Sequence, residues 1–276
     1  MSEVKLNVIK TTVDIGLGHE VKFLHLTDTH IALEDEGDPR ERFKYFSHAE
    51  EYFHQSCAYA NENGLVMVNT GDFLDAHTKR IFDFADEYLL PTDTIYAAGN
   101  HDFCHFVGKA VEDYAYKWER IKYSAPHLPN NLYFYSRVID GVNFVTLDNS
   151  YYSMTDGQVE LLRAEVARGY PIVLGMHVPI FTSAQADKIL GNGNECAYLM
   201  GAPREYTDKY PINRCRQQIP NETTLRAIEY IQNEPMIKLL VTGHTHINFE
   251  DRLPGGTLQI TTDGGYHGVA REITLI

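Results

Sequence analysis

The chain has 276 residues, of which 43% are hydrophobic and 22% are charged, and this balance predicts a folded protein with a sizeable core. Its net charge of −14 argues against proteins that coat DNA or RNA and against polybasic membrane binders, because both need a cationic surface. No apolar run approaches the roughly 20 residues of a transmembrane helix, and Met1–Lys10 lacks the apolar stretch of a secretory signal. We therefore expect a cytoplasmic protein without membrane contact, whose four cysteines are free thiols.

Short apolar runs recur along the chain, and each is followed by a polar cluster that contains aspartate, asparagine or histidine. Runs of this length predict buried strands. The predicted strands are Val21–Leu26, Leu65–Val68, Thr94–Ala98, Pro171–Met176 and Ile237–Val241.

Apolar residues at three- and four-residue spacing predict helices between these strands. The predicted helices are Arg40–Asn63, with Gly64 as its C-terminal cap, Thr78–Leu90, Gly108–Ile121, Asp156–Arg168 and Glu222–Asn233.

The second half of the chain is richer in predicted strands. Leu132–Val138 and Val142–Leu147 flank Asp140-Gly141, a typical hairpin turn, and Ile247–Ile276 is strand-like. The order of elements predicts an α/β (α+β) protein with a central β-sandwich of mixed sheets covered by helices, rather than a purely parallel sheet. We expect residues 1–276 to form a single domain.

Residues 182–220 do not follow this alternation of strand and helix. The segment contains Gly191-Asn-Gly-Asn, Pro203, Pro211 and several basic and tyrosine side chains. Long ordered loops in compact domains often carry function, which makes this segment a candidate lid over a site; the alternative is an ordinary surface excursion.

The polar clusters at the predicted strand ends contain seven candidate metal ligands. Strand ends converge at one edge of a sheet, so residues far apart in sequence are expected to meet there. Carboxylate, imidazole and amide oxygen, without thiolate, suit Mn²⁺, Fe or Zn²⁺. Seven ligands exceed what one ion needs, and a carboxylate that bridges two ions would account for the surplus. The candidates are Asp28, His30, Asp72, Asn100, His177, His244 and His246.

The order of these clusters resembles the calcineurin-like metallophosphoesterase superfamily. Asp-x-His, Gly-Asp, Gly-Asn-His-Asp, His and Gly-His-x-His all occur in that order from Asp28 to His246. Each cluster alone is a weak indication, whereas the ordered set is specific. The resemblance implies a β-sandwich flanked by helices in a four-layer architecture, which agrees with the predicted elements.

The resemblance also implies roles for the individual residues. Asp28, His30 and His246 would hold one metal ion, Asp72 would bridge, and Asn100, His177 and His244 would hold the second ion. His101 corresponds to the family's catalytic histidine, which contacts the phosphate and protonates the leaving oxygen. We expect Asp102 to orient His101, because a carboxylate beside an imidazole fixes its tautomer.

Other polar residues in these clusters have simpler interpretations. His25 alternates with the core face of its strand and is expected to pack there, and we interpret His105 and His267 as structural. Asp75 is expected to be a helix N-cap or an acceptor behind the ligands. Asp148 follows another strand and could line a pocket, as could Asn149.

The resemblance predicts an enzyme that hydrolyses a small phosphate ester with a metal-bound hydroxide. We favour a phosphodiester or nucleotide-type substrate; the alternatives are a phosphomonoesterase or a non-catalytic scaffold on the same fold. An amidohydrolase is disfavoured because its His-x-His would lie near the first strand, whereas here it comes last. The expected partner is a small phosphorylated metabolite or nucleotide and not a long nucleic acid, and the basic residues Arg204, Arg214 and Arg216 are candidates to hold a second phosphate.

Overall fold

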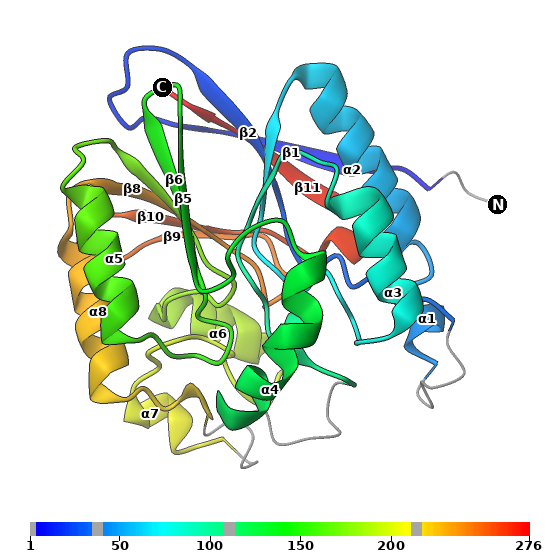
Figure 1. Ribbon diagram of the computed structural model, residues 1–276. Coiled ribbons are helices and arrows are strands. Elements are labelled where there is room, and N and C mark those ends of the chain that lie inside the picture. The colour runs from blue at the N-terminus through cyan, green and yellow to red at the C-terminus, as the bar shows by residue number, and fades with distance from the viewer. Residues whose placement is uncertain (1–3, 35–40, 107–113, 211–216) are drawn as a thin grey trace.

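The computed structural model describes residues 4–34, 41–106, 114–210 and 217–276. Two β-sheets lie face to face at the centre of the molecule, and helices cover the outer face of each sheet (Figure 1). The predicted fold class is confirmed: the chain forms an α/β structure of two mixed sheets flanked by helices.

The first sheet has five strands in the order β1-β11-β2-β3-β4. The C-terminal strand β11 lies between β1, to which it is parallel, and β2, to which it is antiparallel. The strands β2, β3 and β4 are mutually parallel, so their carboxyl ends meet at one edge. The bounds are β1 Asn7–Val13, β2 Val21–Leu26, β3 Val66–Asn69, β4 Thr94–Tyr96 and β11 Val269–Leu275.

The second sheet has six strands in the order β5-β6-β7-β8-β10-β9. The predicted hairpin is confirmed as β5 and β6, which pair antiparallel around Asp140 and Gly141, both with positive φ. The strands β6, β7, β8 and β10 run parallel, and β9 closes the far edge antiparallel to β10. The bounds are β5 Phe134–Ile139, β6 Val142–Leu147, β7 Ile172–Gly175, β8 Ile237–Thr242, β9 Phe249–Arg252 and β10 Leu258–Thr261.

An apolar core fills the space between the sheets. Phe23 of β2 meets Phe144 of β6 edge to face, with ring centroids 5.2 Å apart, and both side chains are buried. Val68, Val173 and Val241 belong to the same cluster. The continuous apolar runs of the sequence therefore form strands that are covered on both faces, as expected for buried strands.

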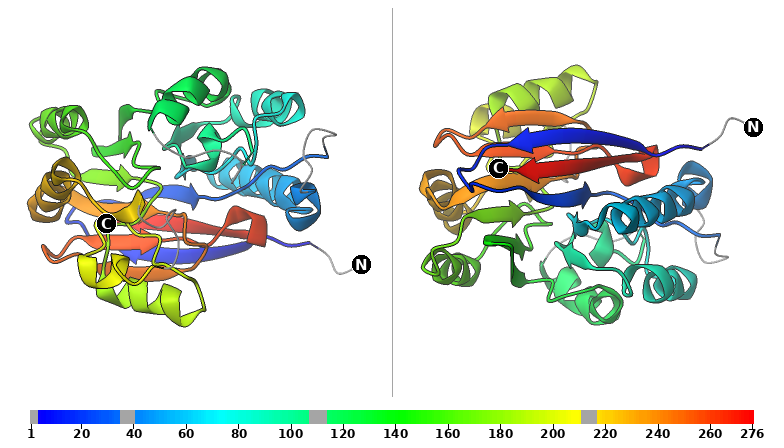
Figure 2. Two further views of the ribbon diagram at one scale, coloured as in Figure 1. Left: turned by 90° about the horizontal axis from the view of Figure 1, so that it is seen from below. Right: turned by 90° about the horizontal axis from the view of Figure 1, so that it is seen from above.

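The helices complete a four-layer arrangement, which both views of Figure 2 show around the paired sheets. In Figure 1, α2 and α3 cover the first sheet, and α5 and α8 cover the second. The bounds are α1 Arg42–Tyr45, α2 Ala49–Asn63, α3 Lys79–Phe84, a π-helical turn Ala85–Leu89, α4 Tyr114–Ser124, α5 Asp156–Val166, α6 Ser183–Gly191, α7 Arg204–Thr207 and α8 Glu222–Asn233.

Several helix ends match the sequence pattern. Gly64 ends α2 in the left-handed conformation, as predicted, and α8 has the predicted bounds. Thr155 begins α5 with a capping box, in which its hydroxyl accepts from the backbone of Gln158.

The predicted helix Arg40–Asn63 is wrong at one point. The predicted helix is interrupted by a turn between α1 and α2, which contains Phe46. The buried ring of Phe46 stacks on His30, with ring centroids 4.8 Å apart. Phe46 fits the helical spacing but packs against a site residue instead. The start of the predicted helix Gly108–Ile121 lies outside the described residues, and its remainder forms α4.

Residues 182–220 contain two helices that the sequence did not predict, α6 and α7, while 211–216 lie outside the described residues. Buried amide side chains fix the base of the segment. Gln259 of β10 bonds to both backbone groups of Ile180 and to Gln185 of α6, which itself donates to Thr261. This part of the segment is therefore anchored to the second sheet; its closing as a lid, like the single-domain organisation of residues 1–276, stays a prediction.

Two smaller observations complete the fold. No helix within the described ranges is long and apolar enough to cross a membrane. Cys57, Cys104 and Cys196 carry thiols that are not joined in disulfides, as expected, and Cys215 lies outside the described residues.

Candidate metal centre

The loops that follow the parallel strands of the first sheet contribute four of the seven predicted metal ligands, together with His101. Asp28 and His30 follow β2, and Asp72 follows β3. Asn100 and His101 follow β4. The parallel pairing of these strands brings the three loops to the same edge of the sheet.

The second sheet contributes the remaining three predicted metal ligands. His177 follows β7, and His244 and His246 follow β8. The two loops are joined by a backbone hydrogen bond from Gly243 to His177. The site is therefore assembled across the seam between the two sheets.

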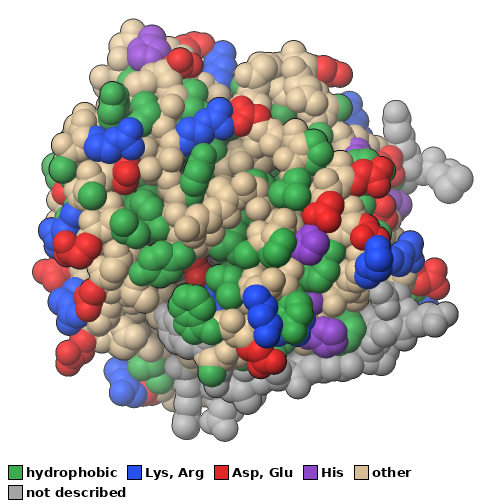
Figure 3. Space-filling view, viewed as in Figure 1, with side chains coloured by type: hydrophobic (Ala, Val, Ile, Leu, Met, Phe, Trp, Pro, Cys, Tyr) green, Lys and Arg blue, Asp and Glu red, His purple; other side chains and the backbone are tan. Residues whose placement is uncertain are grey.

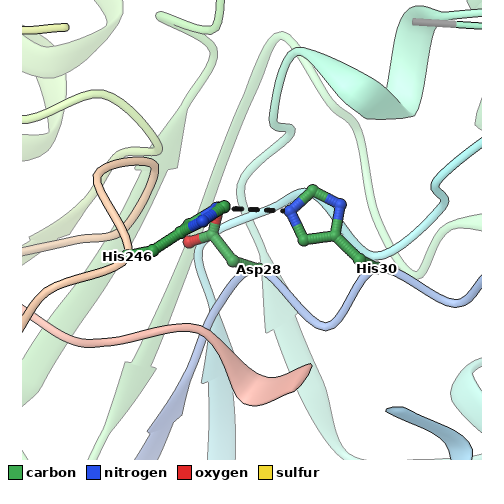
Figure 4. Close-up of side chains that lie close together, drawn as sticks. All are labelled: Asp28, His30 and His246. Atoms are coloured by element: carbon green, nitrogen blue, oxygen red, sulfur yellow. Dashed lines mark hydrogen bonds and ion pairs between the residues drawn. The ribbon is translucent and has the colours of Figure 1, made fainter. Parts of the chain in front are cut away.

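Asp28, His30 and His246 form one cluster, and Figure 4 shows them pointing toward one another. His246 Nε2 lies 3.1 Å from Asp28 Oδ1 and 3.3 Å from His30 Nε2. Asp28 and His30 are at most 1% exposed.

Asp72, His177 and His244 form a second cluster, together with Asn100. His177 Nε2 lies 3.3 Å from Asp72 Oδ2, 3.0 Å from His244 Nδ1 and 3.2 Å from Asn100 Oδ1. Asp72 Oδ2 also lies 3.9 Å from His30 Nε2. Asp72 thus stands between the two clusters, where the sequence analysis placed the bridging carboxylate.

The spacing of these donor atoms fits metal coordination. Ligand atoms at about 2.0–2.2 Å from one ion, separated by tetrahedral or octahedral angles, lie roughly 2.9–3.5 Å apart. Five donor distances, two in the first cluster and three in the second, fall in this range, and His30 Nε2 lies slightly farther from Asp28 Oδ1, at 3.8 Å. The donor set contains oxygen and nitrogen without sulfur, so the residues fit two divalent ions of the borderline class.

Burial and charge make the two carboxylates strong cation sites. Burial raises the pKa of Asp28 and of Asp72, but the facing histidines outweigh this and hold both below the usual range. His177 shows the complementary effect: burial lowers its pKa, but Asp72 and Asp28 raise it to about 9. Positive charge is therefore favoured at the point where these side chains converge.

The backbone of the site is strained in a way that points to function. Non-glycine residues with positive φ cost about 1–2 kcal/mol each and persist where the surroundings enforce them. Five of the seven predicted ligands adopt this conformation: Asp28, His30, Asp72, His244 and His246. The neighbouring backbone also approaches closely, because a Cβ on Gly99 would lie 2.1 Å from Asp72 Oδ1.

His101 is oriented by a different carboxylate from the one expected. Its Nδ1 lies 3.1 Å from Asp75 Oδ1, and the same oxygen lies 3.0 Å from His30 Nδ1. The guanidinium of Arg42 donates to both oxygens of Asp75, to Oδ1 at 2.7 Å and to Oδ2 at 2.5 Å. Burial raises the pKa of Asp75, but the hydrogen bonds from Arg42, His101 and His30 hold it well below its usual range. Of the two interpretations offered for Asp75, the acceptor fits; the N-cap of α3 is Thr78.

Asp102, which we expected to orient His101, instead supports the loop that carries Asp72. It accepts hydrogen bonds from the backbone of Asp72, Leu74 and Gly99 at 3.0, 3.0 and 2.8 Å. The hydroxyl of Tyr96 donates to it at 2.6 Å. The short 3-10 turn His101–Phe103 directs this carboxylate into the core, away from the imidazole of His101.

Two tyrosines that the sequence analysis missed hold the outer nitrogens of predicted ligands. The hydroxyl of Tyr152 lies 2.7 Å from His244 Nε2, and that of Tyr266 lies 3.0 Å from His246 Nδ1. His177 uses the backbone oxygen of Thr70 in the same way, at 2.7 Å from its Nδ1. Each contact leaves the other ring nitrogen directed at a cluster.

A cavity of about 250 Å³ opens above the second cluster. His101 lines it, and so do parts of residues 182–220. The described residues that line it are Asp72, Asn100, His101, Ser150, Tyr151, Tyr152, Ile189, Asn194, Tyr198, Gln217, Gln218, His244, Thr245 and His246.

The other histidines singled out from the sequence lie apart from the clusters. His25 is buried between the hydroxyls of Thr70 and Thr262, and burial lowers its pKa to about 3, which confirms its structural interpretation. His267 pairs with Asp263, at 2.9 Å. His105 is exposed and does not belong to a metal cluster within the described ranges.

The remaining candidates for the cavity have different surroundings. Asp148 forms an ion pair with Lys117, and Asn149 bonds to the backbone of Val178, so neither lines the cavity. Arg204 is exposed on α7 and pairs with Asp208, away from the cavity. Arg214 and Arg216 lie outside the described residues.

Comparisons with known proteins agree with this geometry. A family model described as calcineurin-like phosphoesterase matches residues 21–248. The fold is similar to that of a dimetal phosphatase from Danio rerio, with a TM-score of 0.53, 14% identity and coverage of 89% of this chain and 88% of that chain.

Two further structures show weaker likeness. The anchor protein of the inner membrane complex of Plasmodium gives a TM-score of 0.46 at 12% identity, over 89% of this chain and 72% of that chain. An NAD nucleotidase from Haemophilus influenzae gives 0.45 at 13% identity over 89% of this chain, which spans only 45% of that protein. No curated protein matches the chain.

Proposed function

Because the chain belongs to the calcineurin-like phosphoesterase family and is therefore a hydrolase of phosphoric esters, we propose that it acts at a dinuclear metal centre. The proposed substrate is a small phosphate ester, with a phosphodiester or nucleotide-type substrate favoured. The ligands in this proposal are Asp28, His30, Asp72, Asn100, His177, His244 and His246. The proposed ions are Mn, Fe or Zn, which the mixed oxygen and nitrogen donors suit.

One observation carries the proposal: two ligand clusters meet at Asp72, beside a histidine that faces a cavity. When bound, two such ions supply Lewis-acid stabilisation of phosphate oxygens and activate water. The cavity gives a substrate access to His101 and to the second cluster, while Asp28 and His177 lie buried beneath it.

His101 is the proposed acid at the leaving oxygen. Burial lowers its pKa, but the carboxylates of Asp72 and Asp75 outweigh burial and raise it. Asp75 accepts a hydrogen bond from the Nδ1–H of His101. The second proton of this imidazole is therefore held at Nε2, on the side of Asp72 and the cavity. A proton at this atom can stabilise charge on the phosphate and pass to the departing alkoxide.

Size and charge support a small substrate. The cavity is slightly smaller than the roughly 300–1,000 Å³ of typical ligand pockets, which favours a small phosphorylated metabolite or nucleotide. In Figure 3, acidic and basic side chains are interspersed over the coloured surface without a broad basic patch, and the net charge is −14. Neither feature favours a long nucleic acid.

The test compares bis(p-nitrophenyl) phosphate with p-nitrophenyl phosphate in the presence of Mn²⁺. Asp72→Asn removes the shared carboxylate, and Asp83→Asn, at an exposed ion pair on α3, is the matched control. We expect turnover that Asp72→Asn abolishes and Asp83→Asn preserves. Faster hydrolysis of the diester supports the phosphodiesterase assignment, and faster hydrolysis of the monoester favours the phosphatase alternative.

A protein that contains both ions and hydrolyses neither compound would favour the scaffold alternative. All seven predicted ligand positions are occupied by suitable side chains and converge, which argues against that outcome.

A further inference from the structure

We propose that Tyr152, Tyr198 and Ile189 form a wall that binds the organic group of the substrate, and that this group carries a flat ring. The inference deepens the proposed function and rests on it, because it names the class of ester that the same cavity accepts. We call these three residues the tyrosine wall.

The tyrosine wall stands beside the second cluster. The ring centroid of Tyr152 lies 5.3 Å from that of His244, and the ring centroid of Tyr198 lies 6.1 Å from that of the same histidine. All three wall residues line the cavity, together with Asn100 and His101. A phosphate held between the second cluster and His101 therefore places its organic group against two aromatic rings.

Backbone strain shows that both tyrosines are held in position. Tyr152 has a φ of 59° and Tyr198 a φ of 54°, in the left-handed region that bulky side chains rarely adopt. Such conformations concentrate at ligand clamps, where the surrounding structure enforces them.

A residue with a buried amide side chain holds the backbone of each tyrosine. The backbone carbonyl oxygen of Asn149 accepts from the Tyr152 N–H at 2.9 Å, and the side-chain amide of Asn149 is itself fixed by hydrogen bonds to both backbone groups of Val178. Gln218 accepts from the Tyr198 N–H at 3.0 Å and donates to Cys196. Both amides are at most 1% exposed, so the two rings are positioned before a ligand arrives.

The polarity of the lining narrows the substrate further. Apart from Asp72 and the histidines, the lining residues that the structure describes are uncharged, while Arg214 and Arg216 lie outside the described residues. The lining offers aromatic and apolar surface with the amide of Asn194, which matches a planar group with polar edges. Aryl phosphates and nucleoside monophosphates share this chemistry.

The experiment compares three esters with the same phosphate: adenosine 5′-monophosphate, phenyl phosphate and ribose 5-phosphate, which has no flat ring. If the protein hydrolyses bis(p-nitrophenyl) phosphate faster than p-nitrophenyl phosphate, the methyl diesters of these three compounds are used instead. We expect kcat/KM for at least one ring-bearing ester to exceed that of the ribose ester by about 5- to 100-fold, the range for bases that stack on aromatic side chains. The better of the two ring-bearing esters distinguishes an aryl from a nucleoside substrate.

Variants assign the preference to the tyrosine wall. Tyr198→Ala should lower kcat/KM for the ring-bearing esters much more than for ribose 5-phosphate, whereas Tyr198→Phe should retain the preference for ring-bearing esters. Tyr206→Ala is the matched control, because Tyr206 lies in the same segment but packs on Phe181 outside the cavity.

Equal rates for ring-bearing and ribose esters in the wild-type protein would overturn the inference, and so would an equal loss for both in Tyr198→Ala. Calorimetric binding of the same compounds to the metal-loaded protein distinguishes a failure of the proposed function from a failure of the tyrosine wall. If no ester is hydrolysed, the proposed function fails, while relative affinities that do not depend on Tyr198 refute the wall.

Discussion

The hydroxyl of Tyr152 is predicted to control the affinity of one metal site without altering the other. His244 directs Nδ1 at the second cluster, so its proton must lie on Nε2, where the Tyr152 oxygen accepts it at 2.7 Å. Tyr152→Phe keeps the ring and removes this acceptor. The imidazole then loses the contact that fixes its tautomer and its direction.

Partners of this kind are worth about 10- to 100-fold in metal affinity. At about 1.36 kcal/mol per tenfold, this is roughly 1.4–2.7 kcal/mol. The value agrees with the about 1–3 kcal/mol for leaving a buried donor without an acceptor. His244 is only partly buried, so the lower half of the range is expected.

The assay is a titration of metal-stripped protein with Mn²⁺, fitted to two sites. Tyr266→Phe is the matched variant, because Tyr266 contacts His246 of the first cluster. Tyr152→Phe should weaken one site and Tyr266→Phe the other. Two unchanged isotherms, or the same site weakened in both variants, would refute the reasoning, and unchanged thermal unfolding of the stripped variants would exclude a general loss of structure.

Three further predictions follow from the same contacts. Asp75→Asn should lower kcat/KM by about 10- to 100-fold in steady-state assays, because one amide oxygen cannot replace the carboxylate that serves His30, His101 and Arg42; full activity would contradict the role of Asp75. Gly99→Ala should destabilise the protein by about 1–3 kcal/mol in denaturant titrations, since its Cβ would lie 2.1 Å from Asp72 Oδ1, and an unchanged midpoint would show that the loop yields freely. Chelation of metal present at about 100 times its Kd should lower the free energy of unfolding by about 2.7 kcal/mol for each site, which corresponds to a fall in Tm of about 5–10 °C for each site. An unaltered Tm would argue against metal bound to the folded state.

The convergence of the predicted ligands could be anticipated from the sequence because each follows a short apolar run. Parallel pairing of β2, β3 and β4 then brings Asp28, Asp72 and Asn100 together. The register of strands that are buried on both faces is fixed by packing, so the strand ends are well determined. These features are local in the sequence and repeat along it.

The contacts behind the ligands could not be anticipated in the same way. Asp102 is adjacent to His101 in sequence, yet a single 3-10 turn directs it inward and leaves Asp75 to bond the imidazole. Tyr152 and Tyr266 each lie five residues beyond the end of a strand, β6 and β10 respectively, in segments without a sequence period. Only their position beyond strand ends could have pointed to them, and many loop residues share that position.

The place of β11 has a consequence for how the polypeptide folds as it is synthesised. This strand ends at Leu275 but lies inside the first sheet, and it is the strand to which β1 pairs. Translation proceeds at about 5–20 residues per second, so roughly 10–30 seconds separate the emergence of His101 from that of β11. Until then β1 and β2 lack the neighbour between them.

The half of the site built on the first sheet therefore matures only after the segment that carries β11 has left the ribosome. A nascent chain that carries Asp28 and Asp72 has the acidic groups but not the frame that aligns them with His177 and His246. Removing β11 would act in the same way on a folded protein, because it would withdraw an interior strand rather than trim an edge.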